Sequence, residues 1–255
     1  MYSESPFFQA KKPREVHIGY FKATRKASYS LVFSLPLLLG YEVLIRLQNT
    51  PVVNGVANWI EQLSNLLGFW GRIVASALVV LLCIFAIYRD RKQGIKIKKF
   101  YMVGMMIESL IYAFLLAPLV AIIFFGYKLI IYDEHSLGMT TQIALCLGAG
   151  FYEEFVFRFL LIGFPFVMLD NMYPESKMYG TKLLIFAISA ALFSYIHYIG
   201  TYADVFTWSS FIFRMGAGMV LGIIFLLRGF GIAAWTHAIY DILITFDVLK
   251  YFFHS

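Results

Sequence analysis

Three ionisable side chains lie within six residues of one another in an apolar stretch of the chain, at Glu153, Glu154 and Arg158. If the stretch is helical, Glu154 and Arg158 are four residues apart on one face and can form an ion pair. Glu153 is rotated by about 100° from its neighbour and points elsewhere. An ion-paired structural patch needs only one glutamate. The second carboxylate, Glu153, is therefore the candidate for chemistry.

Two histidines lie in apolar segments further along the chain, each paired with a residue four positions away. Phe193 shares a helical face with His197, and His237 shares one with Asp241. Asp241 could hold the His237 ring in one tautomer, as a carboxylate does where an imidazole must present one particular nitrogen. A carboxylate and two imidazoles that converge in a dry cavity could activate a water molecule, with the carboxylate as general base.

The composition indicates that these residues lie inside a membrane. Hydrophobic residues make up 60% of the 255 residues and charged residues only 14%, against about 25% charged in an ordinary soluble domain. A charge in the middle of a spanning helix costs about 2.5–3.5 kcal/mol, so such residues usually face the protein interior and have a function. Cys83 and Cys146 both lie in apolar runs. This placement indicates neither a disulfide framework nor a cysteine metal site.

We predict an all-α, polytopic membrane protein with about seven transmembrane helices. A helix needs about 20 apolar residues to cross a bilayer. The stretches that meet or approach this length are 28–47, 69–88, 101–127, 139–168, 181–199, 207–227 and 230–253. Residues 52–67 mix polar and apolar side chains, and we predict a short amphipathic segment on the outer surface. The predicted parts of the chain are a basic N-terminal segment (1–27), N-terminal transmembrane helices (28–127) and a catalytic core (128–255) that contains the last four helices.

The distribution of positive charge predicts the orientation in the membrane and argues against nucleic acid as a partner. The chain has 21 Lys and Arg residues and a formal net charge of +6. Six of them precede residue 28 and six lie within 89–99, which is typical of cytoplasmic segments that flank spans. With the N-terminus in the cytoplasm, 15 of the 21 fall on that side. Because no organellar targeting sequence is evident, we expect an integral protein of a prokaryotic plasma membrane. Its expected partners are membrane lipids and a membrane-associated protein or peptide substrate.

In their order along the chain, these residues closely resemble the motifs of the CPBP family, which covers CAAX prenyl endopeptidases and bacteriocin-processing or immunity-type membrane proteases. The motifs E-E-x-x-x-R, F-x-x-x-H and H-x-x-x-(N/D) stand here as Glu153–Arg158, Phe193–His197 and His237–Asp241. The resemblance covers about residues 140–250. It implies a glutamic-type intramembrane endopeptidase that cuts near the C-terminus of its substrates. No cofactor is favoured, and zinc is possible.

The resemblance also implies a role for each residue of the motifs. Glu153, assisted by His197, deprotonates the attacking water. His237 and Asp241 stabilise the oxyanion of the tetrahedral intermediate. An ionised Asp241 cannot donate a hydrogen bond, so our hypothesis is that it orients His237 and keeps it protonated. The residues that support the site are Glu154, Arg158 and Phe193.

Three alternatives stay open from the residues alone. Glu153, His197 and His237 are acceptable zinc ligands that would leave an open position for water, although the H-E-x-x-H helix of many zinc proteases is absent. A non-catalytic membrane scaffold or immunity protein could use the same polar cluster for folding or for binding a partner. A proton-coupled transporter also uses membrane Glu and His, but no pair of Gly/Pro-broken helices marks two related halves.

The predicted span boundaries raise two geometric questions. They place His197 near the outer end of its helix and His237 near the inner edge of the membrane. At this placement the two rings could be more than about 10 Å apart along the membrane normal. Arg214 lies in the middle of a predicted span and needs an acidic partner. The candidates for that partner are Glu154, Asp204 and Asp241.

Overall fold

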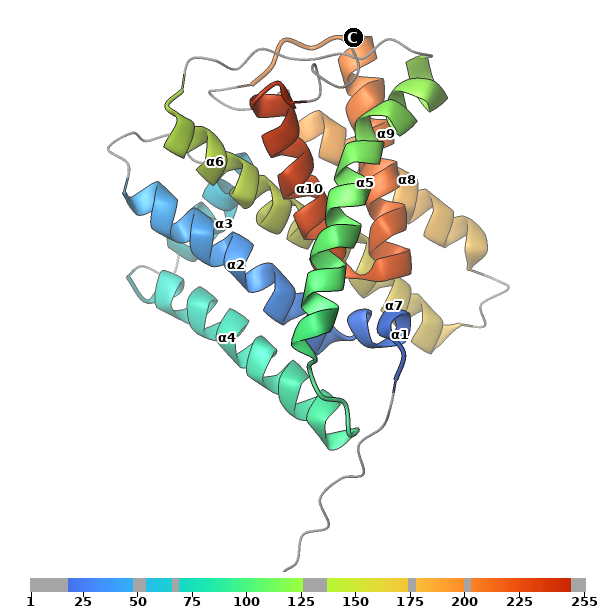
Figure 1. The fold of residues 1–255 in the computed structure, drawn as a ribbon. Helices are drawn as coiled ribbons and strands as arrows, with labels where there is room; N and C mark the ends of the chain where they lie inside the picture. The colour runs from blue at the N-terminus through green and yellow to red at the C-terminus, as the bar shows by residue number, and fades with distance from the viewer. Residues whose placement is uncertain are drawn as a thin grey trace, which may run out of the picture.

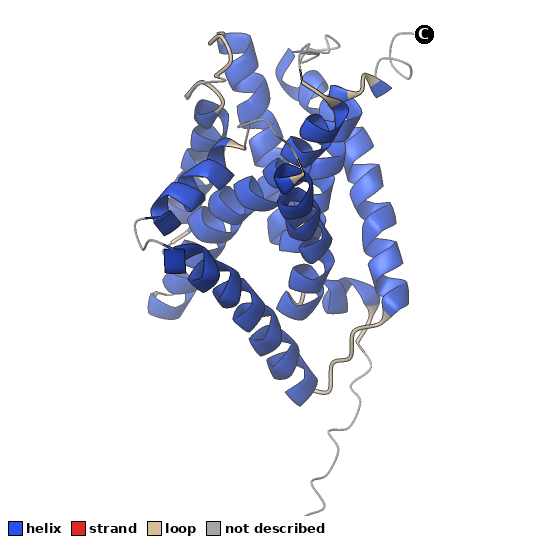
Figure 2. Ribbon diagram, turned by 90° about the vertical axis from the view of Figure 1, so that its left-hand side faces the viewer, coloured by secondary structure: helices blue, strands red, loops and turns tan. Residues whose placement is uncertain are grey.

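The computed structural model describes residues 18–47, 54–65, 69–125, 137–173, 178–199 and 203–248. Within them the chain forms helices joined by short loops (Figure 1), and Figure 2 shows no strand in this part of the chain. The helices are α1 (Tyr20–Thr24), α2 (Ala27–Arg46), α3 (Gly55–Asn65), α4 (Phe69–Lys92), α5 (Lys99–Phe125), α6 (Met139–Gly148), η1 (Ala149–Glu153), η2 (Phe155–Gly163), α7 (Phe164–Met172), α8 (Tyr179–Ile196), α9 (Trp208–Arg228) and α10 (Phe230–Thr245). Residues 1–17 of the predicted N-terminal segment and 249–253 of the last predicted span lie outside the described residues.

Among the residues that the structure describes, five stretches are long and apolar enough to cross a membrane. They are α2, Lys99–Val120 of α5, the continuous helix Met139–Met172, α8 and α9. Large apolar side chains cover the outside of the bundle, such as Phe100 (81% exposed) and Leu183 (64% exposed), as expected for a surface in contact with lipid. The prediction of an all-α polytopic membrane protein is confirmed. The number of seven spans stays a prediction, because α4 is not among the five and α10 has only 16 residues.

Helix α10 lies at the centre of the bundle. It packs against α2, α5, α6, η1 and α9 (Figure 1). Small side chains allow this dense packing, since Ala233, Ala234 and Ala238 have no exposed surface. A Cβ on Gly231 would lie 2.8 Å from the backbone oxygen of Ser30, so a glycine is needed where α10 meets α2. The central helix therefore holds His237 in the interior, where 3% of its surface is exposed.

The segment that carries the two glutamates is not wound as an ordinary α-helix. Residues 149–153 and 155–163 form the π-helical turns η1 and η2 between α6 and α7. Wider π turns are rare in proteins and occur frequently at functional sites. The sequence predicted one regular span over 139–168. The structure keeps the helix continuous but changes its winding at the residues proposed to do chemistry.

Helix α3 lies within the predicted amphipathic segment 52–67. The helix begins against the protein core, since Asn54, Val56 and Ala57 are all buried. Val56 belongs to the same apolar cluster as Phe193. The start of α3 therefore packs on the protein core and lies next to η1.

Candidate active site

Glu153 is a buried carboxylate at the end of η1 whose two oxygens have different surroundings. Only 6% of the residue is exposed. Its Oε1 accepts a hydrogen bond from Nδ2 of Asn54 at 2.9 Å, whereas its Oε2 has no hydrogen-bond partner among the described residues. The imidazoles of His197 and His237 both lie within electrostatic range of the carboxylate. Asn54 thus holds one oxygen in place, and the other contacts no hydrogen-bond donor among the described residues.

Asn54 positions Glu153 from the start of α3. Its Oδ1 accepts hydrogen bonds from the backbone nitrogens of Val56 (3.0 Å) and Ala57 (3.1 Å), so the side chain caps the first turn of the helix. The amide group of the same side chain then donates to Glu153, which is 99 positions away in the sequence. Nothing in the sequence linked Asn54 to the site. Asparagine before an amphipathic segment is typical of a helix cap. The cap explains what the side-chain oxygen binds, but it does not predict which distant residue accepts a hydrogen bond from the side-chain nitrogen.

Glu154 joins the predicted supporting residues to the central helix. It is completely buried, and its Oε1 lies 2.8 Å from Nη1 of Arg158 and 2.8 Å from Nδ1 of His237. The ion pair expected from the four-residue spacing therefore forms. A buried carboxylate is tolerated when cationic and hydrogen-bonding partners surround it. The structure adds a role that the spacing did not predict, because Glu154 fixes the orientation of the His237 ring.

Arg158 connects η2 to α8 and α9. Its side chain is 1% exposed, and its Nη2 donates to the backbone oxygen of Gly218 at 3.1 Å. Its guanidinium also lies over the ring of Phe193, 4.1 Å from the ring centroid, a cation–π contact. A Cβ on Gly218 would lie 2.9 Å from that ring. Gly218 therefore makes the space in which Phe193 and Arg158 pack together.

Both histidines contact the ring of Phe193. The ring centroids of His197 and His237 lie 5.4 Å and 5.5 Å from the Phe193 centroid, each in an edge-to-face arrangement. The structure thus brings the two imidazoles to one side chain, although the predicted span boundaries allowed a wide separation. Nδ1 of His197 lies 2.9 Å from the backbone oxygen of Phe193. Because a carbonyl only accepts, His197 carries a proton on Nδ1, which leaves its Nε2 for another partner.

Asp241 lies at the edge of this group. Its Oδ2 is 3.4 Å from Nε2 of His237, and its side chain is 28% exposed. The contact is longer than that of Glu154 with the other ring nitrogen. Arg214 forms an ion pair with Asp204, with 2.5 Å between Nη2 and Oδ2. Of the three predicted candidates, Asp204 is thus an observed partner of Arg214.

Gly150 allows the central helix to approach η1. A Cβ at this position would lie 2.6 Å from the backbone oxygen of Ala234 and 2.6 Å from the Cβ of Ala238. His237 lies between these two alanines in the sequence, and Glu154 follows Gly150 by four residues. The close contact of the two backbones therefore sets the distance between Glu154 and His237.

Of the residues offered as zinc ligands, His237 has both ring nitrogens next to carboxylates. Among the residues that the structure describes, no group of three or more His, Cys, Asp and Glu side chains could hold a metal ion. A histidine ligand needs a free ring nitrogen to face the metal. Nδ1 of His237 contacts Glu154 and its Nε2 faces Asp241. Both nitrogens are thus directed at carboxylates.

Residues 135–243 match the family model of the type II CAAX prenyl endopeptidases described as Rce1-like. The matched region contains all three motifs, from Glu153 to Asp241, and it extends from just before α6 into α10. The predicted resemblance to the CPBP family is confirmed for this region. No curated protein and no solved structure matches the chain.

Proposed function

Because residues 135–243 carry an Rce1-like domain, we propose that this protein is an intramembrane endopeptidase of the glutamic type. The family supports a membrane protease in general terms. The observation that carries the finer proposal is the environment of Glu153, a buried carboxylate that accepts a hydrogen bond from the neutral amide of Asn54, whereas Glu154 is ion-paired with Arg158. Oε2 of Glu153, like that of Glu154, has no hydrogen-bond partner among the described residues. Two imidazoles lie within electrostatic range of Glu153. This is an arrangement that a general base for water activation requires.

In the proposed reaction Glu153 is the base. Its Oε2 takes a proton from a water molecule held with the help of Nε2 of His197, and the oxygen of that water attacks the scissile carbonyl carbon. The carbonyl oxygen becomes the oxyanion of a tetrahedral intermediate. When the C–N bond breaks, the proton on Glu153 passes to the leaving amine nitrogen. The products are a new carboxylate and a new amino terminus.

His237 is the proposed donor to the oxyanion. Its Nδ1–H is directed at Glu154, so the ring presents Nε2–H towards the reacting group. In the resting arrangement Nε2 faces Asp241 at 3.4 Å, a contact long enough to be given up when the oxyanion forms. Removing one oxyanion donor typically costs about 2.7–4 kcal/mol of transition-state stabilisation. Glu154 and Arg158 act as positioning residues, because Glu154 contacts the imidazole and Arg158 holds Glu154, and neither touches the substrate.

The proposed substrate is a membrane-associated protein or peptide that is cut near its C-terminus. A zinc-dependent protease is the less favoured form of the same activity, because both nitrogens of His237 face carboxylates. The proposed partners are the membrane lipids around the bundle and the protein or peptide substrate. We propose no cofactor.

The experiment that tests this function compares the membrane proteomes of cells that express the wild type, Glu153→Gln or the control Glu42→Gln. Glutamine is nearly isosteric with glutamate, so the first variant removes the base and keeps the packing. Glu42 accepts a hydrogen bond from the hydroxyl of Tyr152 at 2.8 Å, and glutamine retains an acceptor there. We expect one or more membrane proteins to keep an extra C-terminal segment in Glu153→Gln cells only. A scaffold would keep its phenotype in both variants, and identical C-termini in all three strains would refute the proposal.

A further inference from the structure

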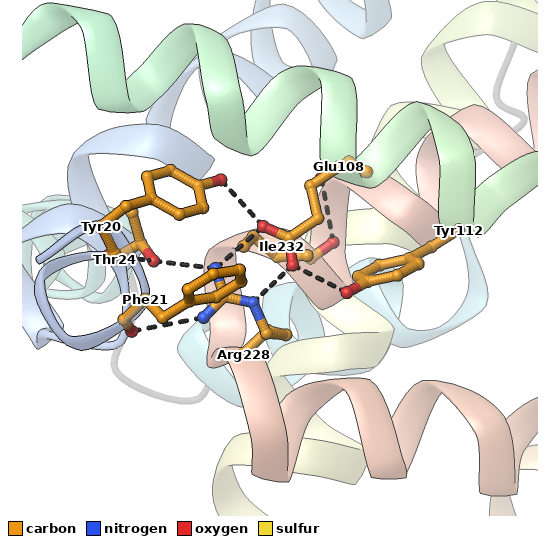
Figure 3. Close-up of polar contacts among 8 residues, drawn as sticks. Tyr20, Phe21, Thr24, Glu108, Tyr112, Arg228 and Ile232 are labelled. Carbon is orange, nitrogen blue, oxygen red and sulfur yellow. Dashed lines mark hydrogen bonds and ion pairs between the residues drawn. The ribbon is translucent and has the colours of Figure 1, made fainter.

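A second buried polar cluster lies away from the candidate active site, where α1 meets α5 and α9 (Figure 3). Arg228, the last residue of α9, forms an ion pair with Glu108 of α5 through both Nε and Nη2. The hydroxyls of Tyr20 and Tyr112 donate to the same carboxylate at 2.8 Å and 2.7 Å. Burial and the hydrogen bond to Glu108 raise the pKa of the Tyr20 hydroxyl, so it stays protonated as a donor. The charge of Arg228 is thus matched by Glu108.

Arg228 also fastens the short helix α1 to the end of α9. Its Nη2 donates to Oγ1 of Thr24 at 2.9 Å, and its Nη1 donates to the backbone oxygen of Phe21 at 3.3 Å. Its guanidinium lies 4.7 Å from the centroid of the Phe21 ring. A five-residue helix is not stable by itself. The cluster therefore determines how α1 presents its remaining side chains.

Those side chains form an open pocket of about 570 Å³ at the end of α9. The residues that line it are Phe21, Lys22, Arg25, Lys26, Leu227 and Arg228. The lining holds four cationic side chains and no carboxylate. None of these residues belongs to the proposed catalytic site.

The positive charge of the pocket is largely uncompensated. Lys22 and Lys26 have no ion-pair partner among the described residues, and Arg25 donates to a backbone oxygen, that of Leu226, at 3.3 Å. Only Arg228 is neutralised within the lining, by Glu108. Three cations thus converge on one pocket without a counter-ion from the described residues. Such a site attracts an anion with several acceptor oxygens, and a phosphate group meets this description.

The apolar part of the lining identifies the molecule that would carry the phosphate. Phe21 and Leu227 are 67% and 59% exposed although they are large and apolar. They flank the cations at the end of α9, which is long and apolar enough to span the membrane. Lipid headgroups lie at the ends of spanning helices, and basic pockets between such helices bind anionic headgroups. A soluble anion would gain nothing from the exposed ring and the leucine.

We propose that this pocket binds the phosphate of an anionic phospholipid. Lys22, Arg25 and Lys26 contact the phosphate oxygens, and the upper part of an acyl chain packs on Phe21 and Leu227. The site is distinct from the proposed active site. A bound lipid would hold α1 against α5 and α9 at the headgroup layer.

Binding is measured on the full-length protein in detergent by native mass spectrometry, with phosphatidylglycerol and phosphatidylcholine of identical acyl chains. The double variant Lys22→Gln/Lys26→Gln removes two charges from the pocket. Each basic side chain near an anionic lipid surface contributes about 1 kcal/mol, so we expect phosphatidylglycerol to bind about 30-fold more weakly. Phosphatidylcholine binding should not change. The control Arg91→Gln/Lys92→Gln removes the same charge from the exposed end of α4 and should bind as the wild type does.

Three results would overturn the proposal. The first is an equal loss in the pocket variant and in the α4 control, which would mean that net charge alone attracts the lipid. The second is wild-type protein that retains phosphatidylcholine as well as phosphatidylglycerol. The third is displacement of phosphatidylglycerol by millimolar inorganic phosphate, which would identify the pocket as a site for a soluble anion. Lys22 is exposed and Lys26 is half-buried, so neither substitution should impair folding.

Discussion

Replacing Gly150 by alanine tests whether the approach of η1 to α10 sets the geometry of the candidate active site. An alanine Cβ would lie 2.6 Å from the backbone oxygen of Ala234 and 2.9 Å from the backbone nitrogen of Ala238. Ordinary contact for a Cβ begins at about 3.4 Å, so the two helices must separate by about 0.8 Å. No side-chain rotation relieves the clash, because these atoms belong to the backbone.

The expected loss of stability is modest. Overpacking of a core typically destabilises a protein by about 1–3 kcal/mol. Alanine in place of glycine stabilises a helix by about 1 kcal/mol. The net change in the free energy of unfolding is then at most about 2 kcal/mol. The effect on the site is larger. A separation of about 0.8 Å would lengthen the contact of 2.8 Å between Glu154 and His237 to about 3.6 Å, which is no longer a hydrogen bond.

We therefore expect Gly150→Ala to fold but to lose processing on the order of 100-fold, the effect of a misplacement of about 1 Å at a reacting centre. Processing is measured as the fraction of substrate that keeps its C-terminal segment, using the protein identified by the Glu153→Gln comparison. Folding is measured by thermal unfolding in detergent. Gly180→Ala is the matched control, because a Cβ there meets nothing within 4 Å. A folded Gly150→Ala protein with wild-type processing would refute the reasoning.

Three further predictions address the other contacts of the site. Asn54→Ser keeps a residue that caps α3 but removes the amide donor to Glu153. Loss of the full energy of a hydrogen bond to a charged group should reduce processing about 10- to 150-fold. Thermal stability should change little. Unchanged processing would contradict the positioning role of Asn54. Asp241→Asn should retain processing with a shifted pH optimum, measured as a pH–rate profile on the purified protein, and an inactive but folded variant would show that the carboxylate itself is required. Chelation by EDTA should leave the rate unchanged, whereas a loss that zinc restores would establish a zinc-dependent enzyme.

The helical spacing of the motifs predicted the local pairs of the site well. Glu154 and Arg158 pair as the four-residue spacing requires, and Phe193 lies beside His197 for the same reason. Such pairs depend only on the geometry of one helix, which a sequence specifies directly. The contact between His237 and Asp241 was also predicted, although its length of 3.4 Å makes it the weaker of the two carboxylate contacts of that ring.

The contacts between helices could not be predicted in this way. The bond from Asn54 to Glu153 and the contact from Glu154 to His237 both join elements that are far apart in the sequence. Each depends on how closely two backbones approach, and Gly150 determines one of these approaches. The sequence shows that residue 150 is a glycine, but it does not show which helix packs against that glycine. The π winding of residues 149–163 is likewise absent from the apolar pattern, which is the same for an α-helix.

Two adjacent carboxylates in a membrane helix would be a liability if both had the same surroundings. In the structure Glu153 and Glu154 have different surroundings. Glu154 contacts Arg158 and His237, so its charge is compensated and the residue holds other groups in place. Both glutamates have a buried Oε2 without a hydrogen-bond partner among the described residues, but the hydrogen bond that Glu153 accepts through its Oε1 comes from a neutral amide, that of Asn54. Different environments for two neighbouring acids are how one site obtains both a fixed charge and a base. On this reasoning neither glutamate is redundant, because Glu154 orients the imidazole that the proposed reaction of Glu153 requires.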